Sequence, residues 1–286
     1  MTVHKKRSSG VSELSQAFYQ TPCLPFLVLR TTLDSIHGYA AHLHGALSLG
    51  LILKGRTLLR CGNSNLEASE GQMVLFAPEE VHSCNPIGGM PRSYHMLYID
   101  PSWAKTILGA TSNATLLVAN RIVHDKTTFS HLAALANAIR KGIFSDHQEE
   151  VKALIGTIRV NCRAVSAPPG LSPVMRRSKM ILADAYDEGS PDIACLAKRI
   201  GMGRERFIRT FRRAAGITPG GYRQCLRLQR AQELLRRGSG IAAAALACGY
   251  ADQSHFHRMC VKYLSATPRQ LKTRIPPLRK SSPQHK

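Results

Sequence analysis

The C-terminal part of this chain contains a segment that is repeated once. Three small or apolar positions recur 48 residues later, where Ile193, Ala197 and Gly201 return as Ile241, Ala245 and Gly249. Further along, the offset becomes 49 and pairs Phe207 with Phe256, Arg209 with Arg258, Phe211 with Cys260, and Thr218-Pro219 with Thr267-Pro268. These matches predict that one supersecondary unit is used twice.

Each copy has the pattern of two short helices joined by a tight turn, at residues 192–213 and 241–263. In the first copy, Asp192 is the expected N-cap, Gly201 ends the first helix, and Phe207 lies on the buried side of the second. In the second copy, residues 249–252 form the turn. This is the geometry of helix-turn-helix DNA binding, in which the second helix enters the major groove.

The charge of the chain points to the same partner. The sequence has 39 Lys and Arg against 18 Asp and Glu, a formal net charge of +21. Divided at the Pro-rich segment 167–170, the N-terminal part carries +5 and the last 116 residues carry +16. This asymmetry predicts that a polyanion, double-stranded DNA, binds to the C-terminal part.

The second helix of each unit presents side chains that can contact DNA. Arginine can bind guanine, glutamate can accept from cytosine and glutamine suits adenine, whereas His and Lys hold the phosphate backbone. The expected contacts are Arg204, Glu205, Arg206, Ile208, Arg209, Arg212 and Arg213 in the first unit, and Gln253, Ser254, His257, Arg258 and Lys262 in the second. The alternatives are a solvated helix face and a nonspecific architectural DNA binder.

A linker helix is expected between the two units. Residues 222–237 have apolar positions at helical spacing and no breaker before Gly238. Such a helix of about 16 residues would be near 24 Å long. A rigid spacer of this size suits recognition helices about 34 Å apart, one turn of DNA.

The pattern of the N-terminal part predicts short strands followed by helices. From Pro25 to about Asp100, apolar runs at 26–29, 47–53, 57–59 and 73–76 are separated by Gly, Asn and Pro. Their close spacing favours a sandwich or small barrel. From Thr128 to Arg163, apolar residues recur at three and four residues and predict two amphipathic helices, which either cover the barrel or pair with a second chain.

Residues 172–274 resemble the DNA-binding domain of the AraC/XylS-type bacterial transcription regulators. The family pattern is visible in IACLAKRIGMGRERFIRTFRRAAGITPGGYRQCLRLQRAQELL and in IAAAALACGYADQSHFHRMCVKYLSATPRQLKTR. The matching positions include Leu196-Ala197, Arg209, Phe211, Gly216, Pro219, Tyr222, Arg227, Ala231, Leu234-Leu235, Ala245, Gly249, Phe256, Arg258 and Pro268. Three positions depart: Gly203 replaces a Ser, Cys260 an aromatic core residue and Ser265 a Gly.

The resemblance extends to a cupin-like sensor barrel in the N-terminal part, where HLHGALSLGLILKGR is followed by GQMVLFAPEEVHSCNP. Metal-binding cupins use two His one residue apart, a Glu and a later His. This chain supplies His42, His44 and His82, with Ser48 and Leu49 where the Glu is expected. Alternation would place His42 and His44 on one strand face. Three readings stay open: a three-His metal site, hydrogen-bonding pocket residues and surface histidines.

The resemblance implies an effector pocket, for which the candidate residues are His42, His44, His82, Tyr94 and Tyr98. No metal and no cofactor are expected there. Tyr94, Met96 and Tyr98 alternate on one face and suit either the pocket or the core. The expected function is a cytoplasmic, sequence-specific transcription regulator that responds to a small-molecule effector. Its expected partners are double-stranded DNA, the effector, a second copy of the chain as a homodimer and RNA polymerase, with no membrane.

The competing function is a metal-dependent cupin enzyme fused to a DNA-binding module. The missing carboxylate ligand and the absence of GxSxG, HExxH and P-loop patterns count against an enzyme. The eight cysteines include no CxxC pair, so zinc-finger spacing is absent and reduced thiols are expected. No apolar run approaches the roughly 18 residues of a membrane span.

The sequence therefore predicts a multidomain α+β protein, with an N-terminal cupin-like β-barrel and trailing helices followed by an all-α domain with two helix-turn-helix units. The expected segments are a flexible basic arm at 1–20, the barrel at 21–125, a helical dimerisation pair at 126–166, a linker at 167–172, the DNA-binding domain at 173–274 and a disordered basic tail at 275–286.

Overall fold

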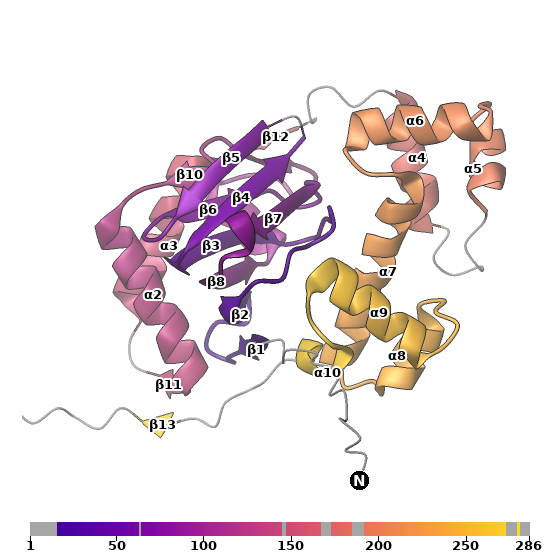
Figure 1. Cartoon of the computed structure of the whole chain (residues 1–286). Coiled ribbons are helices and arrows are strands. Elements are labelled where there is room, and N and C mark those ends of the chain that lie inside the picture. The colour runs from indigo at the N-terminus through magenta and orange to yellow at the C-terminus, as the bar shows by residue number, and fades with distance from the viewer. Residues whose placement is uncertain are drawn as a thin grey trace, which may run out of the picture.

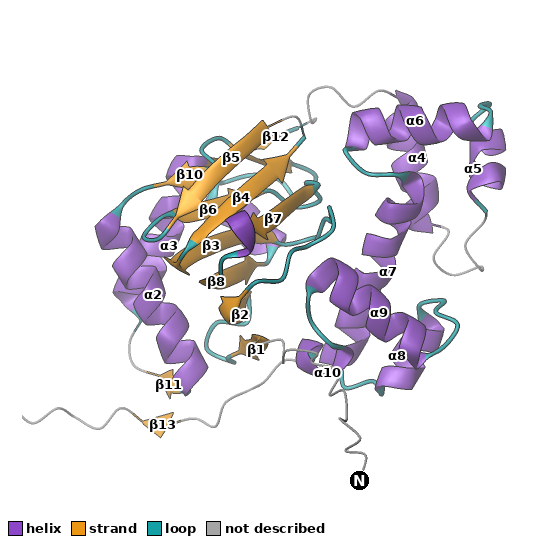
Figure 2. Cartoon of the chain, viewed as in Figure 1, coloured by secondary structure: helices purple, strands orange, loops and turns teal. Residues whose placement is uncertain are grey.

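The computed structural model describes residues 16–62, 64–144, 147–166, 173–184, 192–272 and 279–280. A β-rich N-terminal domain lies beside a helical C-terminal domain (Figure 1). The division into strands followed by helices is clear when the chain is coloured by secondary structure (Figure 2). The predicted fold class is confirmed. No helix in the described ranges is long and apolar enough to cross a membrane.

Two sheets form most of the N-terminal domain. The larger has the order β1 (Gln16–Gln20), β2 (Leu27–Ser35), β8 (Arg92–Ile99), β3 (Leu47–Lys54), β6 (Met73–Phe76) and β10 (Ile122–Val123). The smaller has the order β5 (Ser64–Ser69), β4 (Arg56–Cys61) and β7 (His82–Pro86), followed by the turn η1 (Ile87–Gly89). A separate pair joins β12 (Cys162–Val165) to β9 (Thr115–Val118). The predicted strands at 47–53, 57–59 and 73–76 are all present.

Alternation along the central strands divides the larger sheet into two faces. On β8, Leu97 and Ile99 join the core under the helices, whereas Tyr94 and Met96 belong to a cluster on the opposite side. The helix face is covered by α1 (Pro101–Ile107), α2 (Lys126–Lys141) and α3 (Gln148–Asn161). The opposite face and the smaller sheet enclose a cavity.

The helices α2 and α3 are those predicted between Thr128 and Arg163. Their apolar stripes, which include Leu132, Leu135 and Ile158, are fully buried against the sheet of the same chain. These side chains are therefore not available to pair with a second copy. Any dimer contact through this helical pair would use the outward faces, where Val160 is exposed.

The expected arm at 1–20 is wrong for residues 16–20. They form β1, paired antiparallel with β2. The reason is packing that depends on distant residues, since Phe18 is buried among C-terminal helices and the Gln16 side chain accepts from Arg30. Residues 1–15 lie outside the described part, as does the predicted linker at 167–172. In the predicted disordered tail, Arg279–Lys280 form β13, paired with β11 (Ile143–Phe144); the rest of that tail lies outside the described residues.

The C-terminal domain contains both predicted units. The first pairs α5 (Ile193–Arg199) with α6 (Arg204–Ala215), and the second pairs α8 (Ile241–Ala247) with α9 (Gln253–Leu264). Between them runs α7 (Pro219–Arg236), the predicted linker helix (Figure 1). The sequence did not reveal α4 (Pro173–Asp184) or α10 (Pro268–Leu271) as separate helices.

Both turns contain a glycine in the left-handed region, Gly201 with φ 74° and Gly249 with φ 72°. This conformation is strained for other residues, which explains why the repeat keeps glycine there. The two units have separate cores at the two ends of α7. Tyr222 and Cys225 pack with the first unit, whereas Leu228 and Ala231 pack with the second.

Candidate functional site

The exposed face of α6 carries the residues predicted to contact DNA in the first unit. Phe207 and Phe211 are each 1% exposed, and they fix which side of the helix faces the core. The opposite side is open: Ile208 is half-buried, and six charged residues are exposed, namely Arg204, Glu205, Arg206, Arg209, Arg212 and Arg213. Arg204 donates to Glu205 at 2.8 Å, an exposed ion pair that contributes little to stability.

The second unit presents a less charged face on α9. Phe256 and Cys260 are buried, and Asp252 caps the helix by accepting from the His255 backbone N–H at 2.6 Å. The five predicted contact residues are all exposed: Gln253, Ser254, His257, Arg258 and Lys262. Both second helices are therefore amphipathic elements whose polar faces are free to meet a partner.

A small cavity of about 30 Å³ lies between the two sheets of the N-terminal domain. All five residues predicted for the effector pocket line it: His42, His44, His82, Tyr94 and Tyr98. Met96, which was expected in either the pocket or the core, also lines it. The other lining residues were not predicted, namely Arg30, Tyr39, Ile52, Thr57, Val74, Cys84 and Arg92.

The three histidines converge, but not in the predicted way. His42 and His44 do not lie on one face of a strand; they belong to the loop between β2 and β3, where His42 forms an isolated bridge with His82. One ligand nitrogen from each of the three lies within 4.8 Å of the others. Ser48, which replaces the expected Glu, contacts His44 through its hydroxyl at 3.3 Å.

These histidines are neutral and oriented. Burial lowers the pKa of His42 to about 4 and that of His44 to about 3, and it holds the pKa of His82 well below its usual range. In the neutral ring, Nδ1–H of His42 donates to the Ala40 carbonyl at 2.9 Å, and Nδ1–H of His82 donates to the Glu80 carbonyl at 2.9 Å. Each Nε2 then keeps its lone pair.

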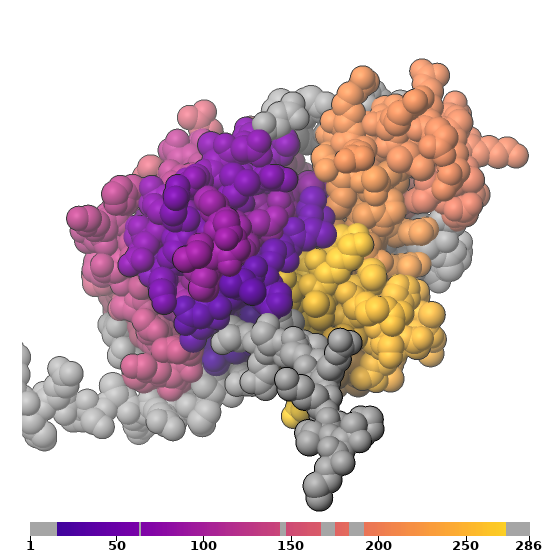
Figure 3. Space-filling model, in the orientation of Figure 1, coloured from indigo at the N-terminus to yellow at the C-terminus, as the bar shows by residue number. Residues whose placement is uncertain are grey.

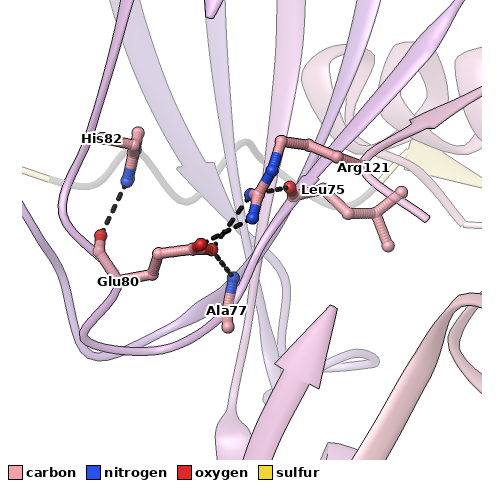
Figure 4. Close-up of polar contacts among 5 residues, drawn as sticks. All are labelled: Leu75, Ala77, Glu80, His82 and Arg121. Carbon is pink, nitrogen blue, oxygen red and sulfur yellow. Dashed lines mark hydrogen bonds and ion pairs between the residues drawn. The ribbon is translucent and has the colours of Figure 1, made fainter. Parts of the chain in front are cut away.

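An ion pair holds the segment that carries His82 (Figure 4). Arg121 donates to both carboxylate oxygens of Glu80, at 2.5 and 3.0 Å, and to the Leu75 carbonyl at 3.1 Å. Glu80 also accepts from the Ala77 backbone N–H at 3.1 Å. The Glu80 carboxylate is thus occupied by these contacts, while its backbone carbonyl orients the His82 ring.

Two buried arginines give the small cavity a positive charge. Arg30 is 4% exposed and Arg92 is 2% exposed. Among the residues that the structure describes, neither guanidinium forms an ion pair, and no carboxylate lines this cavity. Arg92 donates to the Thr57 hydroxyl and to the Cys84 carbonyl. A metal cation at the three histidines would be repelled by these two charges, whereas an anion would be attracted.

A larger cavity of about 300 Å³ lies between the two domains. Phe18, Phe26 and Val28 line it from the N-terminal domain, and Gln229, Leu264 and Leu271 line it from the C-terminal domain. The second unit rests directly against the N-terminal domain, as the contact of yellow and indigo atoms shows (Figure 3).

Comparison with known proteins assigns both domains. Residues 31–154 match the family described as AraC-like ligand binding domain, and residues 196–274 match the family described as Helix-turn-helix domain. The chain is an AraC-type transcriptional regulator. It is 26% identical over 220 residues to the uncharacterized HTH-type transcriptional regulator YbfI of Bacillus subtilis (strain 168), covering 75% of this chain and 80% of that protein.

Two further similarities agree. The regulatory protein ada of Salmonella typhimurium is 32% identical over 80 residues, which cover 28% of this chain and 23% of ada. Crystal structures of ToxT from Vibrio cholerae share the two-domain fold: one has TM-score 0.53 at 13% identity, covering 90% of this chain and 96% of ToxT. Another, of ToxT with an unsaturated fatty acid bound, has TM-score 0.52 at 12% identity, covering 90% of this chain and 93% of ToxT.

The three positions that depart from the AraC-type pattern all lie in or beside the second helices of the units. Gly203 occupies the N-cap of α6 and offers no side-chain cap. Cys260 is fully buried in the core of the second unit, where it fills part of the space of the usual aromatic ring. Ser265 ends α9 in the left-handed region with φ 45°, a conformation that favours the family's glycine.

The buried arginines are the site residues that sequence reasoning missed. Arg30 stands within the apolar run FLVLRTTL, where a charged residue is unusual on a strand. This interruption was the available signal, because an arginine on a buried strand needs a specific set of acceptors. Arg92 begins β8 directly after a proline and gives no such signal.

Proposed function

We propose that this AraC-type regulator binds a specific operator through the exposed faces of α6 and α9, which enter successive major grooves. The observation that carries this proposal is the pair of amphipathic second helices at the two ends of α7, each with its polar face exposed. In the first unit the arginines and Glu205 read bases or hold phosphates; in the second, Gln253 reads a base while His257 and Lys262 hold the backbone.

We infer that a small-molecule effector binds in the cavities of the N-terminal domain and changes how that domain holds the second unit. The contact between this unit and the wall of the larger cavity supports the inference. ToxT with a bound fatty acid shows that a protein of this fold accepts a small molecule. A ligand shifts the equilibrium only if it binds one arrangement more tightly than the other.

The proposal includes the finer expectations about assembly. The regulator acts in the cytoplasm on double-stranded promoter DNA, as a homodimer, and contacts RNA polymerase when it regulates transcription. The residues proposed for each DNA unit are those on the exposed faces of α6 and α9. The proposed segments are the sensor domain at 16–125, which includes β1, the helical pair at 126–166 and the DNA-binding domain at 173–274.

A footprint of the purified protein on the DNA flanking its own gene tests the proposal. At about 150 mM salt, binding through phosphates alone is suppressed. We expect protection of two major grooves one helical turn apart. Tight binding that appears only at low salt and shows no preferred sequence would contradict it.

The competing function, a metal-dependent enzyme, finds no support in the named relatives, which are regulators. Elemental analysis of the purified protein separates the two: we expect no stoichiometric iron, manganese or zinc. A metal that is present at one equivalent and lost in His44→Ala would restore the enzyme hypothesis.

A further inference from the structure

We propose that the effector is an amphipathic organic carboxylate. Its carboxylate binds Arg30 at the junction of the two cavities, and its apolar part fills the larger cavity between the domains. This inference rests on the proposed function, since it names the ligand of the same sensor domain.

The first argument is the state of Arg30. Its guanidinium is charged at any physiological pH and is almost completely buried. Its hydrogen-bond partners are all neutral: the Gln16 side chain, the Tyr39 hydroxyl at 2.6 Å, the Tyr98 hydroxyl at 3.5 Å and the Leu264 carbonyl at 2.9 Å. Its Nε has no hydrogen-bond partner in the described part of the chain. A buried charge without a counterion is costly, so an anion that binds there is strongly favoured.

The second argument is position. Four residues line both cavities and thus mark their junction: Arg30, His42, His44 and Tyr98. Arg30 is the charged group at this junction, and Arg92 adds a second positive charge behind it in the small cavity. The small cavity, about 30 Å³, leaves room for little more than a polar head group. A carboxylate suits the planar donor array of a guanidinium.

The third argument is the lining of the larger cavity. Its walls include six apolar residues from both domains: Phe18, Phe26, Val28, Ile99, Leu264 and Leu271. Burying an aliphatic or aromatic group against them is favourable. Polar side chains, among them Gln20, Gln229 and Gln232, line other parts of the same cavity. A buried cation beside these apolar walls favours a molecule that has an anionic head group and an apolar part.

Arg30 also connects the site to the DNA-binding domain. Nη2 has two hydrogens but three acceptors, the Gln16 side chain, the Tyr39 hydroxyl and the carbonyl of Leu264 at the end of α9. A carboxylate accepts more strongly than a neutral carbonyl. A carboxylate that binds Arg30 therefore weakens the hydrogen bond from Arg30 to the Leu264 carbonyl. Because Leu264 is the last residue of α9, this change acts directly on the second helix-turn-helix unit.

The test is isothermal titration calorimetry of the full chain with matched pairs of ligands. The probes are octanoate, decanoate and 4-phenylbutyrate, each compared with its uncharged primary amide, and acetate as a head group without an apolar part. We expect at least one of the three longer acids to bind roughly tenfold or more tightly than its amide, because a hydrogen bond between charged groups is stronger than one to a neutral amide. Acetate should bind weakly. Equal affinity for acid and amide, or no binding of any acid, would overturn the proposal.

Variants locate the head group. Arg30→Gln should remove the preference for acid over amide while leaving the affinity for the amide nearly unchanged. Tyr98→Phe is the second variant, for use if Arg30→Gln fails to fold, because it removes only the hydroxyl that contacts Arg30 at 3.5 Å and keeps the ring packing. It should reduce the preference for acid over amide severalfold. Arg236→Gln is the matched control, because Arg236 lines the same large cavity but is exposed and paired with Glu233 at 2.9 Å. Loss of the preference in Arg236→Gln and its persistence in Arg30→Gln would place the head group elsewhere and refute the assignment.

Operator binding by the same preparations distinguishes failure of the carboxylate ligand from failure of the proposed DNA-binding function. Sequence-specific DNA binding without any acid preference would refute the carboxylate effector and leave the regulator intact. Acid binding without sequence-specific DNA binding would refute the proposed function and leave the ligand site standing.

Discussion

Arg209 lies on the exposed face of α6, two residues from the buried Phe207 and two from the buried Phe211. These rings hold the helix against the core from the other side, so replacing Arg209 removes a contact group without disturbing packing. The repeat places Arg258 at the equivalent position of α9. The pair therefore tests whether the two units read DNA in the same way.

Arg209→Ala should reduce the affinity for the cognate operator by roughly 1 to 3 kcal/mol and relax one base preference. Binding to a set of operators with single base changes measures both effects. Lys54→Ala, an exposed change in the N-terminal domain, is the control. An equal loss on every sequence would show that Arg209 contacts a phosphate.

Ser265 combines backbone strain with an interdomain bond, since its hydroxyl donates to the Gly38 carbonyl at 3.0 Å and its φ is 45°. Ser265→Ala and Ser265→Gly both lose the hydroxyl, but only glycine relieves the left-handed strain. The free energy of unfolding of Ser265→Gly should exceed that of Ser265→Ala by about 1 kcal/mol. Denaturation followed by far-ultraviolet circular dichroism measures the difference, and equal stabilities would show that this residue carries no strain.

The buried histidines make stability depend on pH. Their pKa values lie below that of an unfolded His, so as pH falls from about 6.5 toward 4 the unfolded chain takes up protons that the folded chain does not. The free energy of unfolding should therefore fall in this range, by up to about 1.4 kcal/mol per pH unit for each histidine. Trp103 is the only tryptophan and stacks on Phe26, so its fluorescence reports this domain.

His42→Gln should make this dependence shallower, because one of the groups that resists protonation is gone. His124→Gln, at an exposed position just before α2, is a control that should leave the dependence unchanged. If the wild-type stability does not change between pH 6.5 and 4, the three histidines are not held neutral by burial.

At the scale of elements, the helices of the two helix-turn-helix units and the linker helix α7 could be predicted from their own apolar stripes and the glycines between them. Gly201 and Gly249 mark turns in sequence just as they do in the fold. β1 could not be predicted, because Phe18 is buried in a cluster formed mostly by the helices of the other domain. The cavity was predicted in part: the histidines stand in a family motif, whereas Arg30 and Arg92 meet them only after the strands pair.

α7 is the element that sets the two units relative to each other. Cys225 packs in the core of the first unit and Leu228 in that of the second, so an insertion between them leaves each core with its own half of the helix. One alanine inserted after Leu226 should rotate one unit against the other by about 100°. We expect affinity for the full operator to fall to that for a half-site. Retained two-groove protection would show that the units do not depend on a rigid α7.

At the scale of the whole molecule, the loop between β2 and β3 connects the effector cavity with the DNA-binding domain. It carries His42 and His44 on the cavity side. On its other side the Ala40 backbone N–H donates to the Lys262 carbonyl at 3.3 Å, and the Leu43 carbonyl accepts from Gln229 at 3.3 Å. A ligand that moves this loop therefore acts directly on α7 and α9.

Phe18 holds the same interface from β1, where it packs against Leu228 and Leu235 of α7. Phe18→Ala should loosen the contact between the domains without opening the core under α2 and α3, because that core does not include Phe18. Hydrogen exchange should increase in β1, in the loop at 38–43 and at the end of α9, while α2 and α3 stay protected. Leu66→Ala, on the outer sheet, is the control. A uniform increase across both domains would mean that the interface is part of one cooperative core, and a ligand could then not release the second unit by itself.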